Sequence, residues 1–214
     1  MSPKIENVRV SYENEPLRKT TIEKDPFKLF GNWLNSAVEA NIPEPNAMTL
    51  ATADSSGRPS ARMVLLKDFD VWGFVFYTNY SSNKGMQLEQ NPYAALVFWW
   101  DVFSRQVRIE GRIKKLKTET SDDYFHSRPH GSQLGALASN QSQIIPSYND
   151  LEKIFTELSE QFEGKKIPRP AHWGGYLLEP DIIEFWQGRP NRLHDRLRFI
   201  KQDSGNWQIV RLAP

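Results

Sequence analysis

Short strand-like runs separated by short turns constrain this chain more than any other feature of its sequence. Five such runs lie between residues 47 and 116, at 47–53, 60–67, 73–79, 93–100 and 105–116. Two of the segments between them, "DSSGRP" and "DFDVWG", have the composition of turns. Connections this short favour antiparallel pairing, because parallel neighbours need a long crossover. We therefore predict an antiparallel sheet, with residues 60–67 as one of its buried strands.

Helical patterns interrupt and follow this sheet. In residues 25–41, Asp25 can cap a helix, Pro26 suits its first turn, and apolar residues recur at helical spacing. Other helical stretches are predicted at 81–91, 121–128, 131–142 and 149–166. Strand patterns return at 173–180, 182–188, 196–200 and 207–212. Strands early, helices in the middle and strands again late indicate one interleaved α+β domain around a closed or nearly closed barrel.

The two ends of the chain set the expected domain limits. Residues 1–24 are polar and are predicted to be a flexible N-terminal arm, which leaves residues 25–214 as a single domain. The Pro-rich stretch 165–173 could be a connector, but the piece after it is too small to fold alone. The start of the chain lacks the apolar run of a signal peptide or membrane span, so we expect a cytoplasmic protein.

Charge and cysteine content exclude several classes of partner. The 27 Lys and Arg residues almost balance the 26 Asp and Glu residues, so no general basic field exists to hold nucleic acid or an acidic membrane. The chain has no cysteine, which excludes disulfides, a thiolate nucleophile and cysteine-based zinc or iron–sulfur sites. We expect no metal site.

A local cluster of cations near the end of the chain nevertheless needs an explanation. In "FWQGRPNRLHDR", an extended backbone from Arg192 onward would place Arg192, His194 and Arg196 on one face. Cationic groups so close together repel one another unless an anion lies between them. The alternative is a solvated strand face in which these residues pair with Asp195 and Glu184.

Polar residues at three other places also suggest anion binding. Arg62 and Lys67 lie in a strand that should be buried, and Lys84 follows two serines at a predicted helix start, where free backbone N–H groups favour phosphate. Gln106 and Arg108 share a strand face. In the alternative interpretation, Arg62 pairs with a carboxylate, Lys84 is an ordinary surface lysine and Gln106 satisfies a neighbouring backbone group.

The helical middle adds further hydrogen-bonding groups. Tyr124, Arg128 and Ser132 lie within "YFHSRPHGS", and Gln141 and Ser142 lie within "SNQSQ". Together these cationic, hydroxyl and amide groups suffice for two phosphates or for one large anionic ligand. Composition and spacing do not name the ligand.

The same segments resemble a known family. "SARMVLLK", "FYTNYSSNKG", "RQVRIEG", "YFHSRPHGSQLGA", "NQS", "WGGY", "EFWQGRPNRLHDR" and "RLAP" occur in the order typical of pyridoxine (pyridoxamine) 5′-phosphate oxidases, from Asp25 to Pro214. The resemblance implies an antiparallel split β-barrel and a homodimer that binds FMN at the subunit interface. It also implies oxidation of pyridoxamine or pyridoxine 5′-phosphate to pyridoxal 5′-phosphate, with O2 as electron acceptor and hydrogen peroxide as product.

The resemblance assigns roles to individual residues. The implied FMN-binding residues are Arg62, Met63, Val64, Leu65, Leu66, Lys67, Tyr77, Thr78, Lys84, Gln106, Gln141, Ser142, Trp186 and Arg196. The implied substrate-binding residues are Lys67, Tyr124, Arg128, Ser132, Arg192, Leu193 and His194, with Arg9 and Tyr12 from the arm. Arg192 and His194 would be catalytic, orienting the pyridine ring and managing charge and protons.

One position departs from the family pattern, and two other functions compete with the oxidase. The family usually has arginine where this chain has Asn83, so one ion pair to the FMN phosphate would be missing. A non-catalytic flavin- or haem-binding split barrel would keep Arg62 and Lys84 without needing the substrate residues. A nucleic-acid-binding barrel would use the arginines along a strand, although the balanced net charge argues against it.

Overall fold

The computed structural model describes residues 11–214, and their contacts divide into two compact units. The first unit comprises the described residues up to Thr49, together with Ala95–Glu110 and Pro180–Pro214. The second unit comprises Leu50–Ala94 and Gly111–Glu179. Each unit is thus assembled from distant parts of the chain, as an interleaved topology requires.

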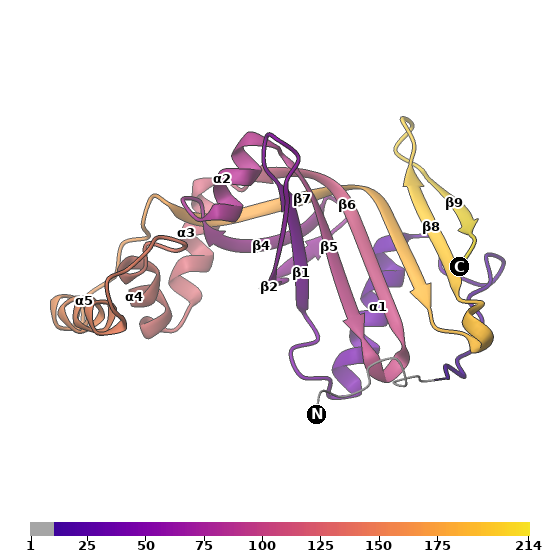
Figure 1. Cartoon of the computed structure of the whole chain (residues 1–214), viewed down its shortest axis with the longest axis horizontal. Coiled ribbons are helices and arrows are strands. Elements are labelled where there is room, and N and C mark those ends of the chain that lie inside the picture. Colours follow the sequence, from indigo (N-terminus) through magenta and orange to yellow (C-terminus); the bar gives the residue numbers. More distant parts are fainter. Residues whose placement is uncertain (1–10) are drawn as a thin grey trace, which may run out of the picture. The chain divides into compact units, whose positions relative to one another are not determined.

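Within residues 11–214, the strands form a nine-stranded sheet with the order β2-β1-β5-β6-β7-β4-β3, extended by β8 on β7 and β9 on β8 (Figure 1). Antiparallel registers join β3 to β4, β4 to β7, β7 to β8 and β8 to β9. The strands are β1 (Ala47–Ala53), β2 (Pro59–Leu65), β3 (Asp68–Asp70), β4 (Gly73–Asn79), β5 (Tyr93–Trp100), β6 (Arg105–Lys115), β7 (Trp173–Gln187), β8 (Asp195–Lys201) and β9 (Trp207–Leu212). The predicted α+β fold with an antiparallel split-barrel sheet is confirmed.

Three details of the strand prediction are wrong. The two strands expected at 173–180 and 182–188 are one continuous strand, β7, because Pro180 and Asp181 keep an extended backbone. The segment expected to be a turn contains the short strand β3. Strand β2 is not buried: its residues alternate between exposed and half-buried, and Met63 is 62% exposed.

Helix α1 (Pro26–Glu39) builds the core of the first unit. The Asp25 carboxylate accepts hydrogen bonds from the backbone N–H groups of Phe27 (2.9 Å) and Lys28, which confirms the predicted cap. The buried face of the helix packs on the sheet through aromatic contacts. The ring centroids of Phe30 and Phe98 are 5.0 Å apart, and those of Trp33 and Phe185 are 5.1 Å apart.

The other helices belong to the second unit (Figure 1). They are α2 (Asn83–Gln90), α3 (Thr118–Ser127), α4 (His130–Ala138) and α5 (Tyr148–Gln161). Helix α4 ends earlier than predicted, so residues 139–142 form a loop. A core of Phe125, Leu134, Ile167 and Trp173 holds α3 and α4 against the start of β7.

The described part of the N-terminal arm lies on the C-terminal strands of the first unit. Asn14 Nδ2 donates to the Gly188 carbonyl (3.1 Å), and the Leu17 N–H donates to the Asp195 carboxylate (3.1 Å). The predicted flexibility of residues 1–24 and the single domain over 25–214 stay predictions.

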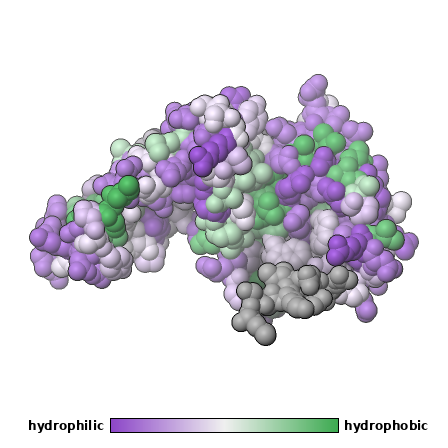
Figure 2. Space-filling view, viewed as in Figure 1, coloured by the Kyte–Doolittle hydropathy of each residue, from purple (hydrophilic) through white to green (hydrophobic). Residues whose placement is uncertain are grey.

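The surface seen in Figure 2 is mixed, with hydrophobic residues in separate patches among hydrophilic ones. Among the helices of residues 11–214, none is long and apolar enough to cross a membrane. The same residues contain no cluster of His, Asp or Glu that could hold a metal ion.

Candidate functional site

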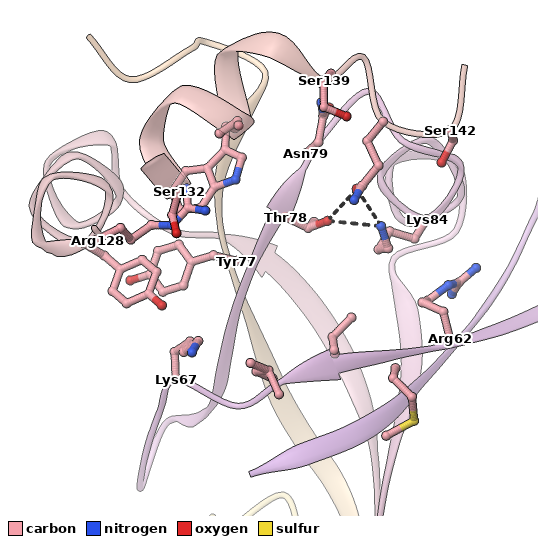
Figure 3. A pocket seen from close by; sticks show the side chains of 18 of the residues that line it. Arg62, Lys67, Tyr77, Thr78, Asn79, Lys84, Arg128, Ser132, Ser139 and Ser142 are labelled. Atoms are coloured by element: carbon pink, nitrogen blue, oxygen red, sulfur yellow. Dashed lines mark hydrogen bonds between the residues drawn. The ribbon is translucent and has the colours of Figure 1, made fainter. Parts of the chain in front are cut away.

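A cavity of about 1010 Å³ lies within the second unit. This volume is at the upper end of the range for sites that bind small molecules and cofactors. Its walls come from β2, β4, the start of α2, α3, α4 and the loop after α4 (Figure 3). The lining residues are Arg62, Met63, Val64, Leu65, Lys67, Tyr77, Thr78, Asn79, Asn83, Lys84, Tyr124, Arg128, Pro129, Ser132, Gly135, Ala136, Ser139, Gln141, Ser142 and Trp173.

The charge of this lining is one-sided. It contains four cationic side chains, Arg62, Lys67, Lys84 and Arg128, and none of the described residues that line it is Asp or Glu. In Figure 3, Arg62 and Lys84 project from one side of the cavity, and Lys67 and Arg128 project from the other. Four cations around one space repel one another, so the cavity is suited to a ligand with two separated anionic groups.

Arg62 is fixed by uncharged acceptors. Its Nη1 donates to Thr52 Oγ1 (2.6 Å) and to the Leu50 carbonyl (3.2 Å), and its Nη2 donates to Gln87 Oε1 (3.4 Å). The carboxylate partner of the alternative interpretation is absent from these contacts. The guanidinium therefore holds its orientation while its charge is not neutralised by an ion pair there.

Lys84 is buried, with 8% of its surface exposed, so it is not an ordinary surface lysine. Its Nζ donates to Gln141 Oε1 (2.8 Å), Thr78 Oγ1 (3.2 Å) and Ser82 Oγ (3.3 Å). Burial, and secondarily the nearby Arg62 charge, lower the pKa of Lys84 to about 8. This ammonium is held by neutral oxygens alone in these contacts, and an anion would stabilise its charged form.

The start of α2 supports this side of the cavity. Ser82 caps the helix, and its hydroxyl accepts a hydrogen bond from the Gly85 N–H (3.3 Å). The Asn83 N–H donates to Ser142 Oγ (3.2 Å), which ties the loop after α4 to the helix start. The loop thus brings Gln141 and Ser142 to the cavity although they lie about sixty residues from Lys84 in sequence.

The opposite side is built on stacked aromatic rings. Tyr77 and Tyr124 stack with their centroids 3.8 Å apart, and Trp173 lies nearly parallel to both. The Arg128 guanidinium lies 4.6 Å from the Trp173 ring centroid. Its Nη1 is buried and has no hydrogen-bond partner among the described residues. Such an orphan donor, next to Ser132 on the cavity wall, marks a place for an oxygen-rich anion.

A second group of predicted residues gathers in the first unit. The His194 ring lies 4.6 Å from the Trp186 centroid and 5.8 Å from that of Tyr12. His194 Nδ1 accepts the Arg189 N–H (3.1 Å), so the neutral ring carries its proton on Nε2. Partial burial, followed by the charge of Arg192, lowers the pKa of His194.

The predicted shared face of Arg192, His194 and Arg196 is wrong. Residues Pro190–Arg192 form a 3₁₀ turn in which Asn191 and Arg192 have φ angles of 56° and 60°, and β8 begins only at Asp195. A left-handed turn breaks the two-residue alternation of an extended chain. Only Arg196 of the three lies in a strand.

Arg196 has the ion pair that the alternative interpretation requires. Its Nη2 lies 2.8 Å from the Glu184 carboxylate, and its Nη1 donates to the Ala213 carbonyl (3.1 Å). Asp195 pairs instead with Arg189 and Arg211. Gln106 is half-buried on β6 in this unit.

The structure therefore sorts the predicted residues into two groups, whose roles stay predictions. The cavity collects Arg62, Met63, Val64, Leu65, Lys67, Tyr77, Thr78, Lys84, Tyr124, Arg128, Ser132, Gln141 and Ser142. Residues outside its lining are Leu66, which is buried just after β2, and Tyr12, Gln106, Trp186, Arg192, Leu193, His194 and Arg196 of the first unit. Arg9 lies outside the described residues.

Sequence reasoning gave no role to two residues that the geometry makes important. Trp173, in the quoted "WGGY", supports Arg128. Glu184, in the quoted "EFWQG", is 2% exposed, and the sequence suggests it only as a possible partner of the arginines. The sequence feature that could have identified them is a large aromatic residue (Trp173) or a carboxylate (Glu184) within a predicted strand that belongs to a quoted segment.

Two family models match the chain. One, described as pyridoxamine 5′-phosphate oxidase, covers residues 34–162, and the other, described as pyridoxine 5′-phosphate oxidase C-terminal dimerisation region, covers residues 173–214. A pyridoxine/pyridoxamine 5′-phosphate oxidase of Microcystis aeruginosa is 55% identical over the whole of both chains. One of Paraburkholderia phytofirmans is 56% identical over 97% of each chain.

A solved structure has the same fold at lower identity. PhzG from Burkholderia lata, crystallised with tetrahydrophenazine-1-carboxylic acid, superposes with a TM-score of 0.87. It is 31% identical, and the match covers 94% of this chain and all of that one.

Proposed function

The chain belongs to the pyridoxine/pyridoxamine 5′-phosphate oxidase family, and on this premise we propose that the cavity of the second unit binds FMN and the phosphorylated substrate together. The enzyme is an FMN-dependent oxidase that converts pyridoxamine or pyridoxine 5′-phosphate to pyridoxal 5′-phosphate, with O2 as the acceptor. The observation that carries the site assignment is the cavity lined by four cations and no carboxylate among its described residues.

The residues present fit FMN. The cavity is large enough for a cofactor, and Arg62 and Lys84 are held in place by uncharged oxygen acceptors. We assign the FMN phosphate to this side, where the Thr78 hydroxyl and the Ser142 loop add neutral hydrogen-bonding groups. When bound, FMN accepts the two electrons that the substrate loses and passes them to O2, giving hydrogen peroxide.

The substrate phosphate is assigned to the other side, with Lys67, Arg128, Tyr124 and Ser132. The orphan Arg128 Nη1 supports this assignment, because a phosphate oxygen would supply its missing acceptor. An arginine fork and a lysine recognise phosphate as a charged group. The unphosphorylated vitamers would leave Arg128 Nη1 buried and unpaired, so we expect poor turnover of them.

Arg192 and His194 are proposed to act on the pyridine ring of the substrate. The proton on His194 Nε2 can be donated to a ring oxygen or nitrogen, while Nδ1 is occupied by the Arg189 N–H. Arg192 is exposed and lies in the strained turn before His194, so its side chain is accessible to substrate. Tyr12 contacts the His194 ring, which supports a role for the arm in covering the substrate.

We also propose that each site is completed by two subunits of the homodimer. Trp186, Arg192, His194 and Arg196 all lie in the part of the chain that matches the dimerisation region, whereas the cationic lining lies in the part that matches the oxidase model. This division supports an arrangement in which the dimerisation region of one subunit closes the cavity of its partner.

The proposal is tested with the purified full-length protein. It should be a yellow dimer with about one FMN per chain, and it should form pyridoxal 5′-phosphate and hydrogen peroxide in equal amounts. A colourless protein that fails to take up added FMN would refute the site assignment, and bound FMN without turnover would favour a non-catalytic flavin-binding barrel. The cytoplasmic location stays a prediction that cell fractionation can test.

A further inference from the structure

A buried carboxylate in the first unit has no role in the function proposed above. Glu184 lies on β7, is 2% exposed, and is surrounded by three guanidinium groups. They belong to Arg196 (2.8 Å), Arg198 (2.9 Å) and Arg108 (3.3 Å). Burying a carboxylate is costly unless it is paired and hydrogen-bonded, and the three arginines provide this compensation for Glu184.

The two oxygens of Glu184 divide the arginines between them. Oε1 accepts from Nε of Arg196 (2.8 Å), and Arg196 Nη2 lies at an ion-pair distance of 2.8 Å from the same oxygen. Oε2 accepts from Nε and Nη2 of Arg198, at 3.1 and 2.9 Å, and from Nη2 of Arg108. Glu110 also pairs with Arg108 Nε (2.8 Å), so the cluster holds one more cation than carboxylates.

Arg196 is fixed at both ends of its guanidinium. Glu184 holds Nε and Nη2, and the Ala213 carbonyl accepts from Nη1. The Nε donor and one Nη1 donor are thus hydrogen-bonded within the protein, which leaves N–H donors on both terminal nitrogens for a ligand. In the register of β7 and β8, Arg196 faces Trp186, another residue of the predicted FMN set.

We propose that Glu184 is a positioning residue for FMN binding, acting through Arg196. The inference rests on the proposed function, because it takes Arg196 as a ligand of FMN. A free arginine loses rotamer freedom when it binds an anion, whereas one already held by a carboxylate loses less. Glu184 fixes the direction of the remaining Arg196 donors, and the excess cation of the cluster keeps the surface attractive to an anionic cofactor.

A purely structural role would look different. If Glu184 only neutralised three half-buried arginines, its loss would weaken the fold and loosen FMN whether or not Arg196 were present. A double-mutant cycle separates the two roles, because a residue that acts through Arg196 has no further effect once Arg196 is removed.

The experiment measures FMN release from the full-length holoenzyme dimer on dilution, followed by the recovery of flavin fluorescence. We expect Glu184→Gln to weaken FMN binding about tenfold, as expected for a misaligned charge-assisted hydrogen bond. Arg196→Ala should weaken it at least as much, and the double variant should match Arg196→Ala. Glu110→Gln is the matched control: it makes the same change in the same cluster without touching Arg196, and it should leave FMN binding within about twofold of the parent.

Each outcome decides a different point. Unchanged FMN binding in Glu184→Gln, or an equal further loss in the Arg196→Ala background, overturns the inference and leaves the proposed function standing. Unchanged FMN binding in Arg196→Ala would show that Arg196 does not bind FMN, and it would also overturn the inference. If Glu184→Gln fails to fold as judged by thermal unfolding, Glu184→Asp keeps the charge but withdraws it by one methylene, and it should loosen FMN by a smaller factor.

Discussion

At the scale of single residues, the buried Lys84 links FMN binding to pH. Its pKa is lowered to about 8 because the ammonium is desolvated and Arg62 is near. In the unfolded chain the same group keeps its proton to a much higher pH. The cost of burying it is therefore fully present below pH 8 and fades as pH rises toward the unfolded pKa.

Binding of a phosphate at Lys84 should reverse that shift, because an adjacent anion stabilises the ammonium. We expect FMN binding to take up a proton above pH 8, and the affinity to fall as pH rises from about 8. Isothermal titration in two buffers with different ionisation enthalpies measures the proton uptake. Lys84→Met should remove this dependence, and a wild-type affinity that stays flat between pH 7 and 10 would contradict the assignment.

A substitution at Asn83 is expected to strengthen FMN binding rather than weaken it. Its backbone N–H donates to Ser142 Oγ, and its side chain lies at the cavity wall near Lys84. Asn83→Arg should leave turnover unchanged and tighten FMN, since a well-aligned charged hydrogen bond contributes about 1.5–3 kcal/mol.

Flavin fluorescence titration measures this change, and Asn83→Gln serves as a neutral control of intermediate length. The gain should shrink at high salt. Looser FMN in Asn83→Arg would show that the side chain faces away from the phosphate.

The sequence predicted most of the site residues but not how they are held. Resemblance named Arg62, Lys84 and Arg128, and the structure collects all three at one cavity. Their supports could not be inferred, because contacts such as Arg128 with Trp173 depend on three-dimensional packing. The prediction that Arg192 and Arg196 share a face was wrong for a local reason. Asn191 and Arg192 both have positive φ, and nothing in "RPNRLHD" indicates this conformation at two successive non-glycine residues.

At the scale of elements, local sequence patterns predicted most of the helices and strands, and β7 is an exception. The cap at Asp25 and the strand-like runs at 47–53 and 93–100 are local properties of the chain, and the structure confirms them. The continuity of β7 through Pro180 was not predicted, because proline usually ends a strand. Whether a proline can remain within a strand depends on the pairing of the neighbouring residues, which the local sequence does not give.

The start of β7 also gives the substrate side its shape. A methyl group on Gly175 would lie 2.5 Å from Leu116 Cδ1 and 2.8 Å from Tyr77 Cε1. The Tyr77 ring is stacked on Tyr124, so it has little room to withdraw. Gly175→Ala should therefore cost about 1–3 kcal/mol of stability and raise the KM for pyridoxamine 5′-phosphate more than it lowers kcat.

Steady-state kinetics and thermal unfolding test this together. Gly131→Ala is the control, because a methyl group there meets no atom within 4 Å. If Gly175→Ala lost stability yet kept the parental KM, the stacked rings would have no part in substrate binding.

At the scale of the whole molecule, two-subunit sites predict complementation. Lys84 and Arg196 belong to different units of one chain. In a mixed dimer of Lys84→Ala and Arg196→Ala subunits, one site would carry both substitutions and the other would carry neither. Random reassociation should restore about a quarter of the parental activity.

The matched control mixes Lys84→Ala with Arg62→Ala. Both residues line the same cavity in one subunit, so no intact site can form. Activity at limiting FMN after unfolding and refolding of the mixtures is the readout. No recovery in either mixture would place each complete site within one chain, and equal recovery in both would show that the recovery does not come from sites shared between subunits.

The one-sided charge of the cavity has a consequence for how much of this protein a cell can keep. Mutual repulsion among Arg62, Lys67, Lys84 and Arg128 makes the empty chain less stable than the loaded one. FMN at a hundred times its dissociation constant would add about 2.7 kcal/mol, and this lowers the population of the open forms that proteases attack. Abundance should then follow flavin supply: in riboflavin-starved cells the chain would be cleared faster than it is in fed ones, so a shortage of one vitamin would limit the production of another.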